Sequence, residues 1–162
     1  MNGQIFDTVA KCFEEEYGKF LWVEVGEETR IFMQVNMKNS QLLCMSRIRE
    51  EKNEFVFSAY YEQKVPESQR QNVAEFLTQV NDSLTRGNFE MDRENGEVCF
   101  TTSIGGADQP VISSEIRPFI WRSLSTADRY LPGLMAVIKA DMPPDQAIAL
   151  VEGEAVFAAL PE

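Results

Sequence analysis

The chain has 162 residues, 44% of them hydrophobic, and a formal net charge of −11 with an isoelectric point near 4.5. This length suits one domain with its own core, and the negative charge repels phosphate backbones and anionic lipid surfaces, which argues against nucleic acid and membrane partners. The absence of histidine excludes Ser-His-Asp and Cys-His catalytic systems and His-containing zinc sites.

The N-terminal segment is predicted to form an amphipathic helix from about Gln4 to Tyr17, with Gly18 as its stop. Its apolar residues recur at three- and four-residue spacing. The same segment lacks the basic region and unbroken apolar run of a signal peptide, and no later run approaches the roughly 20 residues that span a bilayer. We therefore expect a cytoplasmic protein without membrane contacts. The apolar stripe of the helix comprises Ile5, Phe6, Val9, Cys12, Phe13 and Tyr17.

Four strand-like segments follow, at residues 20–25, 30–37, 41–48 and 54–61. Apolar and polar residues alternate in residues 30–37, as is typical of a strand with one buried face. The segment 20–25 is short, rich in β-forming residues and bounded by Gly18 and Gly26. Short polar turns join these segments, and a parallel return would need a crossover of about a dozen residues or more. The first half of the chain is therefore predicted to be an antiparallel meander.

The second half begins with a helix that starts near Pro66 and ends at Gly87. A β-hairpin follows, with strands near residues 88–91 and 98–102 around the turn Asp92–Gly96. Ser113 or Ser114 is expected to cap a long helix, which Pro132 should kink or divide near residues 128–131. A short terminal helix is expected after residues 143–144, over Ala147, Ile148 and Val151.

Residues with catalytic or ligand-binding patterns are absent from the sequence. Asp92 and Glu94 lack the spacing of a calcium loop, and the pair Gly105-Gly106 lacks the setting of a phosphate-binding loop. The cysteines, Cys12, Cys44 and Cys99, are widely spaced and form no CxxC pair, which favours buried thiols in a reducing compartment. The sequence thus predicts no catalytic, cofactor-binding or metal-binding residue.

Large aromatic residues provide the candidate partner-binding positions. Strands that carry such groups on both faces cannot bury both faces under a single layer of helices. Something else is then needed to cover the second face. The apolar C-terminal residues raise the same question, although we expect them to pack on their own domain. The candidates are Trp22, Phe32, Tyr60, Tyr61, Trp121 and Phe157.

Two stretches together, "VPESQRQNVAEFLTQVNDSLTRGNFEMDRENGEVCFTTSI" and "STADRYLPGLMAVI", resemble the YbjN family of small bacterial proteins over residues 65–138. The resemblance implies an α+β fold similar to class I type III secretion chaperones: a twisted antiparallel sheet with helices mainly on one face, in the order helix, strands, helix, hairpin, long helix. Such chaperones commonly dimerise and hold a partner polypeptide without chemistry, and the YbjN label names a sensory transduction regulator. No catalytic residue belongs to the motifs. The matching positions have structural roles: Gly87, Asn88, Phe89, Asp92, Gly96, Glu97 and Val98 define the hairpin, and Ala127, Asp128, Tyr130, Leu131 and Pro132 seat the long helix.

We therefore expect residues 1–162 to form a single domain that is not an enzyme. Its predicted function is chaperone-like or regulatory protein binding, as a homodimer with a further protein partner whose identity the sequence does not give. One alternative is a sensor that binds a small metabolite between sheet and helices, in a pocket lined by Trp22 and Trp121. Another, a carboxylate-based hydrolase, would need two acids facing each other across a cleft.

Overall fold

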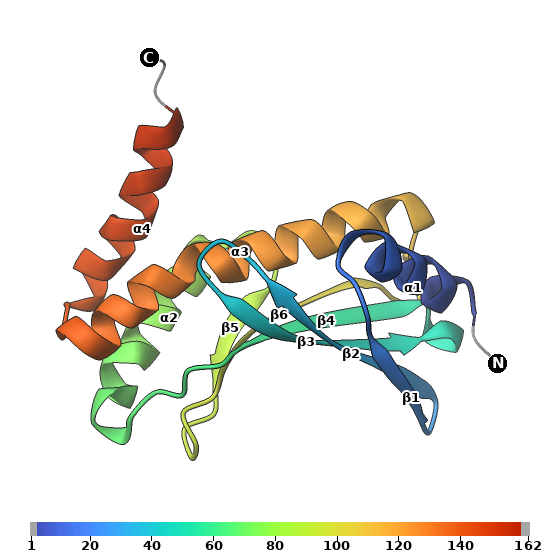
Figure 1. Cartoon of the computed structure of the whole chain (residues 1–162), viewed down its shortest axis with the longest axis horizontal. Coiled ribbons are helices and arrows are strands. Elements are labelled where there is room, and N and C mark those ends of the chain that lie inside the picture. The colour runs from blue at the N-terminus through green and yellow to red at the C-terminus, as the bar shows by residue number, and fades with distance from the viewer. Residues whose placement is uncertain (1–2, 160–162) are drawn as a thin grey trace.

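The computed structural model describes the backbone of residues 3–159 and the side chains of residues 3–153. Within that part of the chain, six strands form one sheet, accompanied by four α-helices (Figure 1). The first half of the chain contains α1 (Gln4–Glu16), β1 (Leu21–Val25), β2 (Glu28–Asn36), β3 (Gln41–Arg49), the 3-10 turn η1 (Glu50–Lys52) and β4 (Glu54–Tyr61). The second half contains the turn η2 (Glu67–Gln69), α2 (Arg70–Ser83), β5 (Asn88–Met91), β6 (Val98–Gly105), α3 (Ser113–Ala140) and α4 (Pro144–Ala159).

The sheet has the order β1-β2-β3-β4-β6-β5, and every neighbouring pair is antiparallel. The predicted meander of β1 to β4 is confirmed. The predicted hairpin, β5 with β6, adds to the sheet through β6, which pairs with β4. This leaves β1 and β5 as the two edge strands.

Helices cover one face of this sheet, which we call the inner face, and the opposite side is the outer face. In Figure 1, α1 and α3 lie above the sheet, and α4 packs mainly against α2 and α3. The apolar residues of the inner face and of the helices form one core, which confirms the α+β fold with helices mainly on one side. Its largest fully buried side chains include Phe13, Ile31, Leu42, Ile48, Phe55, Phe57, Phe76, Ile120, Leu124 and Leu134.

The start of α1 is stabilised from outside its own sequence. The carboxylate of Glu50 in η1 accepts hydrogen bonds from the backbone N–H groups of Phe6, at 2.8 Å, and Ile5, at 3.3 Å. N–H groups in the first turn of a helix have no acceptor within that helix. A negative charge is also favourable at this end of the helix dipole. The carboxylate lies so close to Gly3 that an added Cβ there would meet the Glu50 side chain at 2.3 Å.

Helix boundaries in the second half differ from the predictions. Ser113 does not cap α3: the N-cap is Ile112, and no side chain caps this end. Ser113 lies inside the helix and its hydroxyl accepts a hydrogen bond from Gln4 of α1 at 3.2 Å. Pro132 does not divide α3, which is one element from Ser113 to Ala140. The earlier helix ends at Ser83, before Gly87, and α4 is longer than expected.

Candidate functional site

Residues of the hairpin motif fasten β5 and β6 to the segments around α2. The side chain of Asn81 binds both backbone groups of Phe89: it accepts from the N–H at 2.7 Å and donates to the carbonyl at 3.0 Å. At the hairpin turn, the N–H of Val65 donates to the carbonyl of Gly96 at 2.8 Å. A Cβ at Gly96 would lie 2.2 Å from the Val65 carbonyl oxygen. These contacts give Asn81 and Gly96 structural roles, and neither role requires a catalytic function.

The second motif anchors α3 to the turn between β2 and β3. The buried carboxylate of Asp128 accepts hydrogen bonds from the backbone N–H of Asn39 at 2.8 Å and from the hydroxyl of Ser40 at 2.7 Å. Pro132 has no N–H to donate to the Asp128 carbonyl four residues earlier. The side-chain amide of Asn39 donates to that carbonyl at 3.3 Å instead. This explains how α3 continues through a proline.

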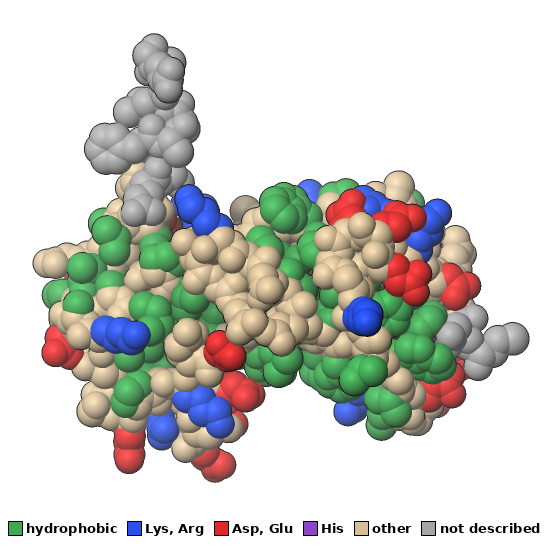
Figure 2. Space-filling view, in the orientation of Figure 1, with side chains coloured by type: hydrophobic (Ala, Val, Ile, Leu, Met, Phe, Trp, Pro, Cys, Tyr) green, Lys and Arg blue, Asp and Glu red, His purple; other side chains and the backbone are tan. Residues whose placement is uncertain are grey.

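The outer face carries large apolar side chains that no helix covers within residues 3–159 (Figure 1). Residues directly opposite in an antiparallel pair share a face, so Leu21, Phe32 and Met45 form one row across three strands, and Leu43 and Tyr60 form the next. Leu21 is 77% exposed, Leu43 58% and Phe32 39%. We call this set, with Val23, the outer apolar patch. Figure 2 shows hydrophobic side chains gathered at the end of the molecule where β1 lies.

A hollow of about 480 Å³ lies over the patch. Its apolar lining includes Phe32, Leu43, Met45 and Tyr60. Polar side chains stand around it on strand ends and loops, namely Gln34, Gln41, Glu62, Lys64 and Glu97. An apolar floor with a polar border is the composition expected of a protein-interaction surface.

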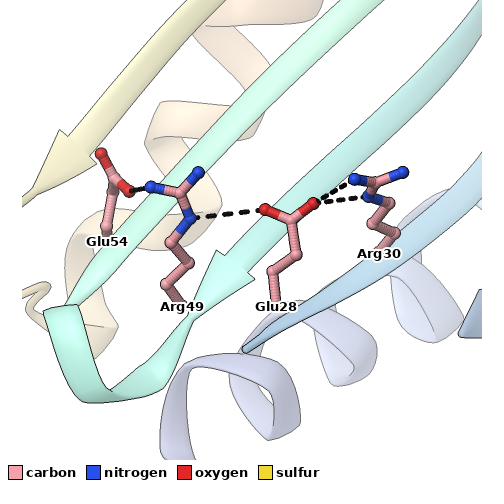
Figure 3. Close-up of polar contacts among 4 residues, drawn as sticks. All are labelled: Glu28, Arg30, Arg49 and Glu54. Atoms are coloured by element: carbon pink, nitrogen blue, oxygen red, sulfur yellow. Dashed lines mark hydrogen bonds and ion pairs between the residues drawn. The ribbon is translucent and has the colours of Figure 1, made fainter. Parts of the chain in front are cut away.

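The outer face becomes charged toward the β1–β2 turn. Glu28 accepts hydrogen bonds from Arg30 Nε at 2.6 Å and Arg49 Nε at 3.3 Å, and Arg49 also donates to Glu54 at 3.1 Å (Figure 3). Burial alone would raise the pKa of Glu28, but the hydrogen bonds and positive charges of the arginines outweigh it, and its pKa is lowered. Glu28 therefore remains ionised and holds two arginines in place.

Arg47 lies between this network and the apolar patch. It is directly opposite Arg30 on β2 and Val56 on β4, and Met45 lies two residues away on the same strand face. Its Nε atom is buried and has no hydrogen-bond partner in the part of the chain that the structure describes. A basic hollow of about 450 Å³ is lined by Val25, Glu27, Glu28, Arg30, Arg47, Arg49 and Lys52.

Of the predicted partner-binding residues, Phe32 and Tyr60 lie together on the outer face. Tyr61 does not: it is 4% exposed on the inner face, and its hydroxyl donates to the Ala127 carbonyl. Adjacent residues of a strand point to opposite faces and Tyr60 occupies the outer one, so the structure does not bring the Tyr61 side chain together with Phe32 and Tyr60. Phe157 lies outside the residues whose side chains are described.

The two tryptophans lie elsewhere. Trp22 is opposite Ile31, on the inner-face side of the edge strand, and its ring contacts Phe6 of α1 with centroids 5.2 Å apart. Trp121 on α3 is 55% exposed and lines a hollow of about 600 Å³ beside the β2–β3 turn and α4. These separate settings do not favour the predicted metabolite pocket over protein binding.

Sequence reasoning did not select Leu21, Leu43, Met45 or Arg47. The sequence carries a signal for two of them: the large apolar residues Leu43 and Met45 alternate with Leu42 and Cys44 along one predicted strand. Large apolar residues at both phases of a strand indicate two apolar faces. The position of Arg47, between the outer apolar patch and the Glu28 network, depends on the register of β2, β3 and β4.

The described residues contain no group of three His, Cys, Asp or Glu side chains placed to hold a metal ion. No helix among them has the length and apolar character needed to cross a membrane. Cys12, Cys44 and Cys99 are free and buried, and burial raises the pKa of the Cys44 thiol to about 12. Thiols in such surroundings are poor nucleophiles.

Comparison with known proteins adds the family. The model of YbjN, described as "Putative bacterial sensory transduction regulator", matches residues 7–135. Among solved structures, YbjN from E. coli, described as "a putative transcription regulator", is 17% identical with a TM-score of 0.48, over 83% of this chain and 90% of that chain. No curated protein matches. On the extent of the family-model match, the chain belongs to the YbjN family.

Proposed function

We propose that this protein is a non-enzymatic, chaperone-like binding module of the cytoplasm, which regulates a partner polypeptide by holding it on the outer face of the sheet. One observation carries the proposal: helices cover only the inner face, while the outer apolar patch exposes Leu21, Phe32 and Leu43. Contiguous apolar surface of this kind is uncommon on monomeric proteins unless it binds something. The family description, which names a regulator and no reaction, is consistent with this role.

The physical driving force is the removal of this apolar surface from water. Each Å² of apolar surface that a partner covers contributes about 25 cal/mol, and stable interfaces bury about 800 Å² on each partner. The apolar hollow gives a partner side chain a concave seat of about 480 Å³. Surface complementarity of that kind concentrates binding energy in a few anchoring side chains.

The decisive test removes the apolar floor without touching the core. A Phe32→Asp/Leu43→Asp double variant should no longer capture, from the cytoplasm of its own organism, the polypeptides that the unaltered chain captures in stoichiometric amounts. Leu150→Asp is the matched control, because Leu150 is 41% exposed on α4, away from the sheet. Identical captured sets from the unaltered chain and the double variant, identified by mass spectrometry, would contradict the proposal.

We further propose a homodimer formed through β1. This edge strand pairs with β2 on one side only, and all five of its residues are exposed. Unpaired strand edges are ready-made sites for a second strand. Light scattering at micromolar concentration should give twice the monomer mass. A monomer mass that persists up to millimolar concentration rules the dimer out.

A further inference from the structure

Arg47 places a positive charge at the border of the outer apolar patch, on the side that faces the Glu28 network. Its strand neighbour on the same face is Met45, and Val56 lies directly opposite on β4. Three arginines, Arg30, Arg47 and Arg49, gather on this face, and like charges directly opposite each other are unfavourable. In a chain whose net charge is −11, this concentration of cations is locally unusual.

Two of the carboxylates nearby are already engaged with the other two arginines, and a third, Glu27, lines the same hollow. Glu28 binds Arg30 and Arg49, and Glu54 binds Arg49. Arg47 forms no ion pair among the residues that the structure describes, and its buried Nε has no hydrogen-bond partner there. A buried donor without a partner carries a desolvation cost, and the guanidinium of Arg47 is not paired with an acceptor among the described residues.

The field of Arg47 reaches both parts of the outer face. Its positive charge contributes to lowering the pKa of Glu28. Burial raises the pKa of Tyr60, and the charge of Arg47 opposes that rise. Arg47 thus lies within electrostatic range of the charged end of the face, at Glu28, and of the apolar hollow, at Tyr60.

Two hollows of similar size therefore lie next to each other along β2 and β3. The apolar one, of about 480 Å³, contains Phe32 and Met45, and the basic one, of about 450 Å³, contains Arg30 and Arg47. On β2, Phe32 and Arg30 are two residues apart, and on β3, Met45 and Arg47 are two residues apart. That corresponds to roughly 6.6 Å in extended chain, which is also the spacing of same-side residues i and i+2 in an extended partner.

We infer that the partner segment held on the outer face is extended and contains an apolar residue followed or preceded, two positions away, by Asp or Glu. The apolar side chain fills the hollow over Phe32 and Met45, and the carboxylate accepts hydrogen bonds from Arg47. This inference rests on the proposed function and adds to it the chemistry of the partner. An acidic ligand group is required because only an anion complements the unpaired guanidinium.

The test uses the full chain and a fluorescent nine-residue peptide, SVTLTETVS, in which Leu and Glu are two positions apart. One comparison peptide replaces Glu with Gln, and another, SVTLETTVS, moves Glu to the adjacent position, on the opposite side of an extended chain. Fluorescence anisotropy should show that SVTLTETVS binds about tenfold more tightly than either, as expected for one charge-assisted contact. High salt should reduce this preference.

Substitution of Arg47 separates this inference from the proposed function. Arg47→Gln should abolish the preference for Glu while retaining apolar binding, and Arg47→Lys should retain part of it. Arg122→Gln, which removes the same charge from an exposed position on α3, should change nothing.

Three results would overturn the inference. The first is equal affinity for all peptides, or a preference for Glu that survives Arg47→Gln. If Phe32→Asp/Leu43→Asp then abolishes binding, the proposed function stands and only the acidic specificity fails. The second is that the chain binds none of the three peptides. In that case the proposed function is tested by the capture experiment alone. The third is a dimer that Phe32→Asp/Leu43→Asp dissociates, because a second copy would then occupy the face.

Discussion

Single hydrogen bonds between distant segments decide several of the conformations described above. Asp128 was identified by its motif, but its partners Asn39 and Ser40 lie almost ninety positions earlier in the chain. No local pattern links these positions, because the contact depends on where the β2–β3 turn meets α3. For the same reason the sequence predicted that Pro132 would disturb the helix and did not predict what compensates for it.

Asn39 and Pro132 should be energetically coupled. Asn39→Ala removes the donor to the Asp128 carbonyl, and we expect it to lower the free energy of unfolding by about 1–2 kcal/mol. In a Pro132→Ala background the new N–H at position 132 supplies the missing bond, so the cost of Asn39→Ala should fall by about half. Urea unfolding of the four proteins measures this, with Lys38→Ala as an exposed neighbouring control. Strictly additive effects would show that the carbonyl contact is unimportant.

Glu28 should make stability depend on pH in the acidic range. Its folded pKa is lowered, so the folded chain binds fewer protons at this position than the unfolded chain does. The stabilisation is fully present above the unfolded pKa of about 4.3 and is lost as the pH falls through the lower folded pKa. The difference in free energy of unfolding between the unaltered chain and Glu28→Gln should therefore be constant at neutral pH and shrink below about pH 4. Glu27→Gln, an exposed neighbour, controls for the lost charge. A difference that does not change with pH would contradict the assignment.

At the level of the elements, the sequence predicted most strands and helices, because strict alternation and helical periodicity are local properties. It did not predict which face of each strand the helices would cover. Tyr60 and Tyr61 show why: alternation places them on opposite faces, but only the packing of α3 over Tyr61 decides that Tyr61 is the buried one. The sequence likewise predicted a second apolar face, through Phe32, but it did not predict that Leu21, Leu43 and Met45 extend this face.

Neighbouring leucines of β3 give a direct test of the two faces. Leu42 is 0% exposed on the inner face, and Leu43 is 58% exposed on the outer face. Leu42→Ala should lower the free energy of unfolding by about 3 kcal/mol, through lost burial and a cavity, whereas Leu43→Ala should change it by less than about 0.5 kcal/mol. Chemical denaturation compares them under identical conditions. Equal losses would mean that the outer face is covered in the isolated chain.

For the whole molecule, the buried thiols report on cooperative opening. Cys44 is 1% exposed in the core, and burial raises its pKa to about 12. In a Cys12→Ser/Cys99→Ser variant, Cys44 should react with a disulfide reagent at pH 8 only through unfolding. The free energy of opening from the labelling rates should then equal that from urea unfolding of the same variant. A much smaller opening free energy would reveal local exposure of β3 without global unfolding.

The unequal borders of the sheet limit how many copies can join. At one border β1 presents five exposed residues. At the other, β5 has only four residues, so Thr102–Gly105 of β6 pair with β4 on one side and have no described strand on the β5 side. Head-to-tail joining of β1 to β5 would repeat without end and produce fibres, whereas a symmetric β1–β1 contact uses up the only long border on both copies. In the proposed dimer, growth of the sheet would stop at a pair, and each outer face would remain open to the proposed partner segment.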